Sequence, residues 1–168
     1  SENFNENLKV INNQIKQIEN LVNEFSDFAR MSKPILRKNN LVDIINENIK
    51  LLSELDKSID IVFVKNSEKI FLECDQEQLS RVFLNLIKNS IESIQQKSEN
   101  ISNFNKKITI ELHQNNNQIT LIITDNGIGF VNFNENIRNV LNPYITTKKS
   151  GTGLGLSIVN KTVNDHNG

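Results

Sequence analysis

Two asparagines four residues apart, Asn85 and Asn89, are the first side chains in this sequence that could do chemistry together. At about 100° per residue they lie one turn apart on the same side of a helix, at the flank of its apolar face. Two amides at the border between core and solvent would form the wall of a pocket. The chain contains 29 asparagines, so the pair alone is more typical of a solvated helix edge than of a pocket.

A second candidate is the segment DNGIGF, which begins at Asp125 directly after an apolar run. A carboxylate at a strand end can accept a hydrogen bond from an exocyclic amine. Gly127 and Gly129 would let the backbone approach a flat ring closely. Asp-Asn-Gly is also one of the commonest turn sequences, so a plain turn stays open as the alternative.

A third candidate is the segment SGTGLGLSIV, in which Gly151, Gly153 and Gly155 lead directly into a helix. Glycines allow backbone N–H groups to face an anion, and the helix N-terminus adds a partial positive charge. Lys148 and Lys149 stand just upstream and suit a phosphate site. The spacing matches neither the P-loop, which ends in Gly-Lys-Ser/Thr, nor the dinucleotide-binding fingerprint.

The element that must position the two asparagines is a helix from Asp75 to Ile94. Asp75 is a good N-cap, and Gln78 three residues later predicts a capping box. The apolar face of this helix consists of Leu79, Val82, Phe83, Leu86, Ile87, Ile91 and Ile94.

A second long helix is predicted near the N-terminus, where apolar residues alternate at four- and three-residue steps. This seam consists of Phe4, Leu8, Ile11, Ile15, Ile18, Val22, Phe25 and Ala29. An exposed stripe of this length implies a partner helix, and no similar pattern occurs elsewhere in the chain. Packing of the stripe on the rest of the domain is the alternative. The helix should end before Pro34, with a linker around residues 31–33.

The remaining pattern alternates short β-rich runs with amphipathic segments. We expect a short strand at 35–37, a helix at 41–55 capped by Asn39 or Asn40, and a loop at 95–105. The other expected elements are strands at 59–64 and 69–72, a hairpin of strands 107–114 and 118–124 turning at 115–117, and a last helix from 156 to 163.

Composition excludes several classes of function. The 168 residues carry a net charge of −1, so no surface for nucleic acid is indicated. One cysteine excludes a disulfide framework. No apolar run approaches the roughly 20 residues of a membrane span, and no signal peptide is recognisable. We therefore expect a soluble, cytosolic segment.

Taken together, the motifs resemble the ATP-binding domain of sensor histidine kinases, in the superfamily of gyrase, MutL and the heat-shock chaperone ATPases (GHKL). LNLIKNSIES is similar to the N box, DNGIGF to the first glycine box, NPYITTK to the F box and GTGLGL to the second glycine box. Their order and spacing agree from about Ile35 to Gly168. EFSDFARM followed by Pro34 is similar to the second dimerisation helix and linker of NtrY-type nitrogen-regulation kinases.

The resemblance implies an α/β (α+β) two-layer sandwich of the GHKL or Bergerat type, with a mixed sheet covered by helices on one face and a long coiled-coil-like helix before it. Residues 1–33 would be the second helix of the dimerisation bundle with its linker, and residues 34–168 the ATP-binding catalytic domain. The intact kinase would be a homodimer through the helix at 4–29. It would act on a response regulator and be anchored in the inner membrane.

The resemblance also assigns site residues for ATP and Mg²⁺. Asn89 would bind Mg²⁺ through its amide oxygen, which suits a hard ion, and Asp125 would bind the adenine amine. Asn85 and Lys148 are the expected catalytic residues. The implied nucleotide-binding set is Asn89, Asp125, Gly127, Gly129, Lys148, Gly151, Thr152, Gly153, Leu154 and Gly155.

The sequence departs from the family pattern in three places. Leu141 and Tyr144 stand where the F box usually carries phenylalanines, and Glu92 stands where many relatives carry a lysine. Neither His113 nor His166 has the His-Glu-x-x-Asn-Pro context of a phosphoacceptor. The acceptor histidine is therefore expected on a helix outside this sequence, and the chain alone should not autophosphorylate.

Two alternative functions remain at this stage. A self-contained ATPase or ATP-gated clamp of the same superfamily generally carries a glutamate one turn before the Mg²⁺ asparagine, to activate water. Asn85 occupies that position, and an amide cannot act as a base. A non-catalytic coiled-coil scaffold with a degenerate nucleotide fold is the other alternative, and it requires that ATP does not bind.

Overall fold

The computed structural model describes residues 2–130, 141–143 and 153–168. Its helices and strands alternate along the chain and are, in order, α1 (Glu2–Ala29), β1 (Arg37–Asn40), α2 (Leu41–Leu55), β2 (Asp60–Lys65), β3 (Phe71–Cys74), α3 (Gln76–Ser98), β4 (Lys107–Asn115), β5 (Gln118–Asp125) and α4 (Gly155–Asp165). Lys148, Gly151, Thr152 and most of the F box lie outside the described residues.

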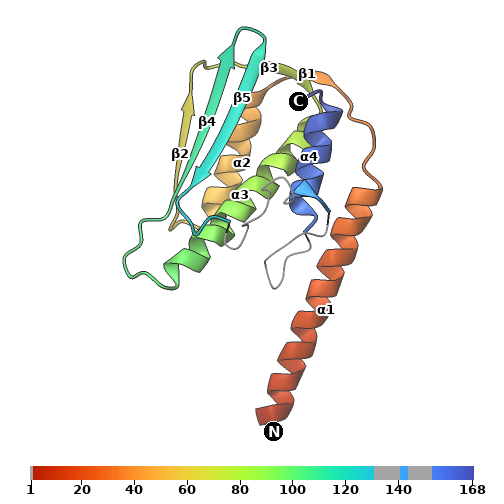
Figure 1. Ribbon diagram of the computed structural model, residues 1–168, viewed down its shortest axis with the longest axis vertical. Coiled ribbons are helices and arrows are strands. Elements are labelled where there is room, and N and C mark those ends of the chain that lie inside the picture. The colour runs from red at the N-terminus through yellow and green to blue at the C-terminus, as the bar shows by residue number, and fades with distance from the viewer. Residues whose placement is uncertain (1, 131–140, 144–152) are drawn as a thin grey trace.

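A three-stranded mixed sheet forms one layer, with α2 and α3 packed on it as the other (Figure 1). The central strand β4 pairs in parallel with β2 and antiparallel with β5. Every second side chain of β4 is buried against the helices, and Ile108, Ile110 and Leu112 are fully buried. Ile87 and Ile94 of α3 are equally inaccessible and complete this core. The expected two-layer α/β sandwich with a mixed sheet is confirmed.

A separate two-stranded antiparallel sheet joins β1 to β3. The strand expected at 35–37 begins only at Arg37, and the strand expected at 69–72 begins only at Phe71. The later start of the first strand has a long-range cause, because the Ile35 N–H donates to the Asp75 carboxylate at 2.9 Å instead of joining a strand ladder. The side chain of Ile35 is exposed, so no burial draws it into the sheet.

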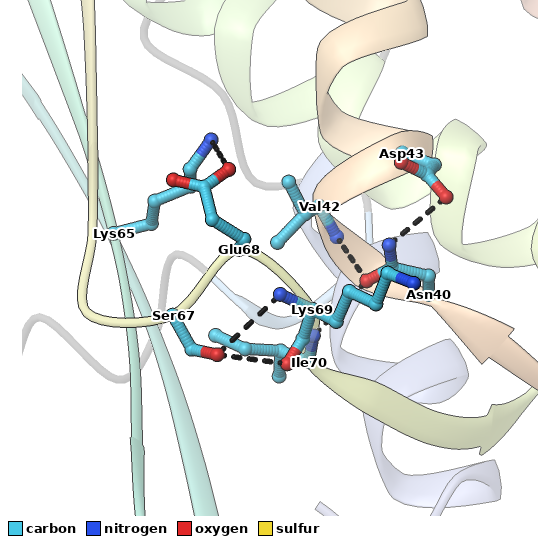
Figure 2. A network of polar contacts seen from close by, with 8 residues as sticks. All are labelled: Asn40, Val42, Asp43, Lys65, Ser67, Glu68, Lys69 and Ile70. Carbon is cyan, nitrogen blue, oxygen red and sulfur yellow. Dashed lines mark hydrogen bonds and ion pairs between the residues drawn. The ribbon is translucent and has the colours of Figure 1, made fainter.

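Asn40 is the N-cap of α2, so of the two caps expected from the sequence, Asn39 and Asn40, the second is the one observed (Figure 2). Its Oδ1 accepts from the N–H of Val42 at 3.3 Å and from the N–H of Ile70 at 3.0 Å. Its Nδ2 donates to Asp43 at 2.9 Å. One amide therefore caps a helix and holds the connection between β2 and β3 against it.

Helix α3 begins as expected, since Asp75 accepts from the Gln78 N–H at 3.1 Å. In a full capping box the Gln78 side chain would also accept from the Asp75 N–H, and the structure does not show this bond. The Gln78 amide donates instead to the Ser32 carbonyl in the linker, and the Asp75 N–H donates to Nε2 of His166. The helix also continues to Ser98, so the loop expected from residue 95 begins later.

Helix α1 extends away from the sandwich with its N-terminus at the far end (Figure 1). The seam residues from Phe4 to Ala29 are solvent-exposed, so the stripe does not pack on the other residues that the structure describes. The helix ends at Ala29, ahead of Pro34, as expected. Within the described ranges, no helix combines the length and apolar character that a membrane span requires.

The hairpin and the last helix also follow the sequence. Strands β4 and β5 pair from Ile108 opposite Asp125 to Asn115 opposite Gln118. Asn116 takes a positive φ of 52° in the turn, which asparagine tolerates better than most residues. Helix α4 is longer than expected, running from Gly155 to Asp165, and it lies beside α3 (Figure 1).

Candidate functional site

The polar edge of α3 faces the start of α4. Asn85 and Asn89 are both half-buried, one turn apart on α3. A Cβ atom added to Gly155 would lie 3.9 Å from Oδ1 of Asn85. The first and third sequence candidates are therefore adjacent in space.

Asp125 ends β5 on the side of the sheet that the helices cover. It stands opposite Ile108, whose side chain is fully buried in the helix-facing core, and paired residues in a sheet point to the same face. Its Oδ1 accepts from the Gly127 N–H at 2.9 Å. Within the part of the chain that the structure describes, Oδ2 has no hydrogen-bond partner, so one carboxylate oxygen is available to a ligand.

Gly127 lies in direct contact with the backbone of α3. A Cβ atom there would be 2.2 Å from Oγ and 2.5 Å from the carbonyl carbon of Ser93, which no side chain can tolerate. Gly129 is different, because its φ is +69° and an added Cβ would have no atom of the described residues within 4 Å. The first glycine is thus required for packing, and the second permits a left-handed conformation beside open space.

Two residues that the sequence interpretation missed, Ser93 and Lys97, hold this segment to α3. The Gly129 N–H donates to Ser93 Oγ, and the Ile128 N–H donates to the Ser93 carbonyl, both at 3.2 Å. Lys97 Nζ donates to the Asn126 carbonyl at 2.8 Å and to the Gly127 carbonyl at 3.2 Å. The signal was present in the spacing, because 85, 89, 93 and 97 form one four-residue series along the helix.

Asn126 is a further missed residue, and it holds the end of β5 to the start of β4. Its Oδ1 accepts from the Lys107 N–H at 3.0 Å, and its Nδ2 donates to the Asn105 carbonyl at 2.7 Å. The turn after Asp125 is therefore bonded on both sides, to α3 and to the sheet.

The start of α4 has the features of an anion-binding helix terminus. Gly153 takes a φ of +70°, and the cap residue Leu154 is fully buried with no side-chain cap. A helix N-terminus without a side-chain cap offers backbone N–H groups and a partial positive charge. Lys148, Gly151 and Thr152, the other predicted residues of this loop, lie outside the described residues.

The hydrogen bonds described for the two histidines and the cysteine do not involve Asn85, Asn89 or the turn after Asp125. His113 is on β4, with Nε2 3.3 Å from Glu111 Oε2. His166 follows α4, and it accepts from the Asp75 N–H while Nδ1 donates to the Thr162 carbonyl. Burial raises the pKa of the Cys74 thiol, which disfavours a nucleophilic role. Among the described residues, no cluster of His, Cys, Asp or Glu could hold a metal ion.

Comparison with known families gives one clear match. The model of the family described as histidine kinase-, DNA gyrase B-, and HSP90-like ATPase matches residues 74–168. The chain is 34% identical to an NtrY-like sensor histidine kinase of Rickettsia conorii over 98% of this chain and 26% of the relative. It is 30% identical to the nitrogen regulation protein NtrY of Azorhizobium caulinodans over 98% of this chain and 21% of that protein. The chain thus spans about a quarter of the length of these relatives.

Solved structures show the same fold. The catalytic domain of the histidine kinase ThkA, in a nucleotide-free form, is 28% identical with a TM-score of 0.65, over 78% of this chain and 81% of that chain. ThkA in complex with the response regulator TrrA gives a TM-score of 0.73 at 24% identity, over 95% of this chain and 43% of that chain. The second likeness includes α1, and at this identity it concerns the fold alone.

Proposed function

Because the chain belongs to the histidine kinase-, DNA gyrase B- and HSP90-like ATPase family, we propose that it is the catalytic part of an NtrY-type two-component sensor histidine kinase. Membership of an ATPase family implies ATP binding. The activity we infer is the positioning of Mg-ATP so that its γ-phosphate transfers to a histidine on a helix outside this chain. One observation carries the proposal, namely that α3 brings the Asp125 turn and the start of α4 to the same polar edge.

We divide the chain at the linker, with residues 1–33 as a dimerisation helix and residues 34–168 as the catalytic domain. The family match begins at residue 74, but the core supports an earlier boundary. Side chains of α2, β2 and β3 pack into the same cluster as α3 and β4. Residues 34–73 therefore fold with the matched part rather than with α1.

At the adenine end, Asp125 would accept a hydrogen bond from the exocyclic amine. The orientation of this carboxylate toward the helices, and the open space beside Gly129, support the fit. Gly127 would form the floor of the pocket, since its missing side chain lets the turn lie against α3. An acceptor at this point favours adenine over a base that presents a carbonyl.

At the phosphate end, we assign the Asn89 amide oxygen to Mg²⁺ and the backbone from Gly151 to Gly155 to the phosphates, together with Lys148. The donor set fits, since amide oxygen is a hard ligand and Mg²⁺ usually takes only one or two protein ligands. When bound, the ion would neutralise charge on the phosphates. The start of α4 would add N–H donors and a positive dipole end.

We infer from Asn85 that the γ-phosphate is transferred to histidine rather than to water. We regard this residue as the position that decides between the two nucleophiles. Asn85 lies on α3 beside the start of α4, and its Oδ1 is 3.9 Å from the Cβ position of Gly155. A base at this position would activate water. An amide cannot take a proton from water. Chemistry then depends on positioning and on charge neutralisation, with an imidazole supplied from elsewhere.

We further propose that the intact kinase is a homodimer through α1 and that its partner is a response regulator. The exposed seam on α1 supports the first part. The ThkA structure contains a response regulator, which supports the second by analogy. We place the catalytic part in the cytoplasm of a membrane-anchored parent, with no role for nucleic acid.

Calorimetric titration with ATP, with and without Mg²⁺, tests the proposal. We expect binding that strengthens with Mg²⁺, and Asn89→Ala should remove most of that enhancement while leaving Mg²⁺-free binding in place. Asn46→Ala is the matched control, because Asn46 is an exposed helical asparagine on α2. Absence of ATP binding under both conditions would refute the function and favour a scaffold. Full Mg²⁺ enhancement in Asn89→Ala would refute the metal assignment alone.

A further inference from the structure

Four hydrogen bonds join the residues 126–129, which we call the glycine segment, to two side chains and one carbonyl of α3. Ser93 supplies its hydroxyl to the Gly129 N–H and its carbonyl to the Ile128 N–H. Lys97 donates to the carbonyls of Asn126 and Gly127. A lysine that bonds two successive carbonyls fixes the direction of the peptide between them.

The Lys97 side chain is itself held in place. Its ammonium lies 5.0 Å from the centroid of the Phe104 ring, within the range of a cation–π contact. The side chain is half-buried, so its bonds to the two carbonyls are partly shielded from water. Lys97 is thus oriented by a ring on one side and by the glycine segment on the other.

The position of the Asp125 carboxylate depends on these contacts. Its Oδ1 accepts from the Gly127 N–H at 2.9 Å, and Gly127 rests on the backbone of Ser93 with no room for a side chain. Lys97 and Ser93 of α3 therefore hold the glycine segment, and the glycine segment in turn holds the Asp125 carboxylate. A shift of the segment would rotate the carboxylate or break its bond.

We propose that Ser93 and Lys97 are positioning residues that set selectivity for adenine over other purines, an inference that rests on the proposed function. They do not contact the base; they hold the Asp125 turn so that its carboxylate faces the exocyclic amine. Hypoxanthine has a carbonyl at that point, which a fixed carboxylate repels. A carboxylate that can turn away rejects it less.

The test compares the affinities for ADP and for IDP in the whole chain. Selectivity is measured as the Kd for IDP divided by the Kd for ADP. Ser93→Ala and Lys97→Met should each reduce this ratio by about three- to tenfold, the range expected for one lost hydrogen bond. A purely structural loss would weaken both nucleotides equally and keep the ratio. Lys97→Arg keeps a donor and should retain most of the selectivity.

Two controls lie on the same helix. Lys88→Met removes an exposed lysine, and Ser98→Ala removes a hydroxyl that donates to the Gln95 carbonyl and lies outside the contacts described above. Both should keep the wild-type ratio. If Ser93→Ala and Lys97→Met also keep it while ADP binds the wild type, the inference is overturned and the proposed function stands.

Amide hydrogen exchange gives a readout that needs no nucleotide. Exchange at Ile128 and Gly129 should accelerate by about three- to tenfold in Ser93→Ala and Lys97→Met, and should stay unchanged in Lys88→Met. Unchanged exchange in the first two variants would show that the contacts do not hold the segment. If the wild type bound neither nucleotide, the selectivity role would fall with the proposed function, whatever the exchange result.

Discussion

At the scale of single residues, Asp125 is the group on which base recognition depends in our proposal. Its carboxylate is placed by one bond to the Gly127 N–H and by the register of β5 against β4. It lies at the end of a strand, so a change of side chain leaves the ladder intact. This makes it a clean site for substitution.

We predict that Asp125→Asn weakens ADP binding by about tenfold or more, since a hydrogen bond to a charged group contributes about 1.5–3 kcal/mol. Thermal unfolding should be nearly unchanged. Asp60→Asn, at an exposed carboxylate on β2, is the control and should bind normally. An unaltered affinity of Asp125→Asn in calorimetric titration would remove the adenine role.

Asn85 tests transfer against hydrolysis. We predict that Asn85→Glu raises the rate of ATP hydrolysis, because the new carboxylate would stand at the start of α4 and could take a proton from water. General-base catalysis contributes roughly 10²- to 10⁴-fold where the geometry is right, so an increase of about tenfold is a modest expectation. Phosphate release measures it. Rapid hydrolysis by the unmodified chain would contradict our interpretation of Asn85.

At the scale of elements, α3 organises the described part of the site, because its polar edge contacts both the turn after Asp125 and the start of α4. Its N-cap Asp75 joins three segments. Oδ1 caps the helix, Oδ2 accepts from the Ile35 N–H between the linker and β1, and the N–H donates to His166 after α4. The start of α3 is thus where the linker, α3 and the end of α4 meet.

The pKa of Asp75 reflects this junction. Burial by itself would raise it, but the N–H groups of Ile35, Gln78 and Glu77, with His166 nearby, hold the pKa below its ordinary value of 3.8. A depressed folded pKa means that the ionised carboxylate stabilises the fold. That contribution is complete above pH 3.8 and is lost as the pH falls through the folded pKa.

We predict that Asp75→Ala lowers the free energy of unfolding by about 1–2 kcal/mol near pH 7, as expected for a lost N-cap. The difference from wild type should shrink below pH 3.8. Denaturant titrations at several pH values measure it. Glu77→Ala, in the first turn of the same helix, is the control and should cost less. A difference that did not change with pH would show that the charge of Asp75 does not contribute.

At the scale of the whole molecule, the exposed seam of α1 is a feature that the other described residues leave uncovered. The helix is 28 residues long, and its large apolar side chains are mostly half exposed or more. Burial of apolar surface contributes about 25 cal/mol per Å², so packing of the seam against a second copy of the chain would be favourable.

We predict that the chain self-associates and that Val22→Glu weakens the association by about tenfold or more. Val10→Glu is a matched control, since Val10 is 57% exposed and Val22 55% on the same helix, but Val10 lies off the seam. Sedimentation equilibrium measures both. Equal effects of the two variants would show that the seam is not the interface, and a monomeric wild type would contradict the proposal outright.

Local pattern was enough for most of the fold. Helix α3, its cap at Asp75, the hairpin of β4 and β5, and the seam of α1 were all predicted, because each depends on periodicity and capping within one segment. The errors were at boundaries. The strand expected at 35–37 begins at Arg37 because a side chain 40 residues away takes the Ile35 N–H. Spacing along the chain contains no trace of such a bond.

The candidate site was predicted as three motifs, and the family they indicated, the histidine kinase-, DNA gyrase B- and HSP90-like ATPases, was confirmed by the family comparison. The roles of Asn89 and Asp125 stay predictions. What tertiary structure alone decided is how the motifs are held: Gly127 against the backbone of Ser93, and Lys97 on two carbonyls of a turn 30 residues further on. Sequence encodes periodicity within an element, whereas contact between elements depends on packing of the whole core. The physics of that packing is non-local, so only the folded chain shows it.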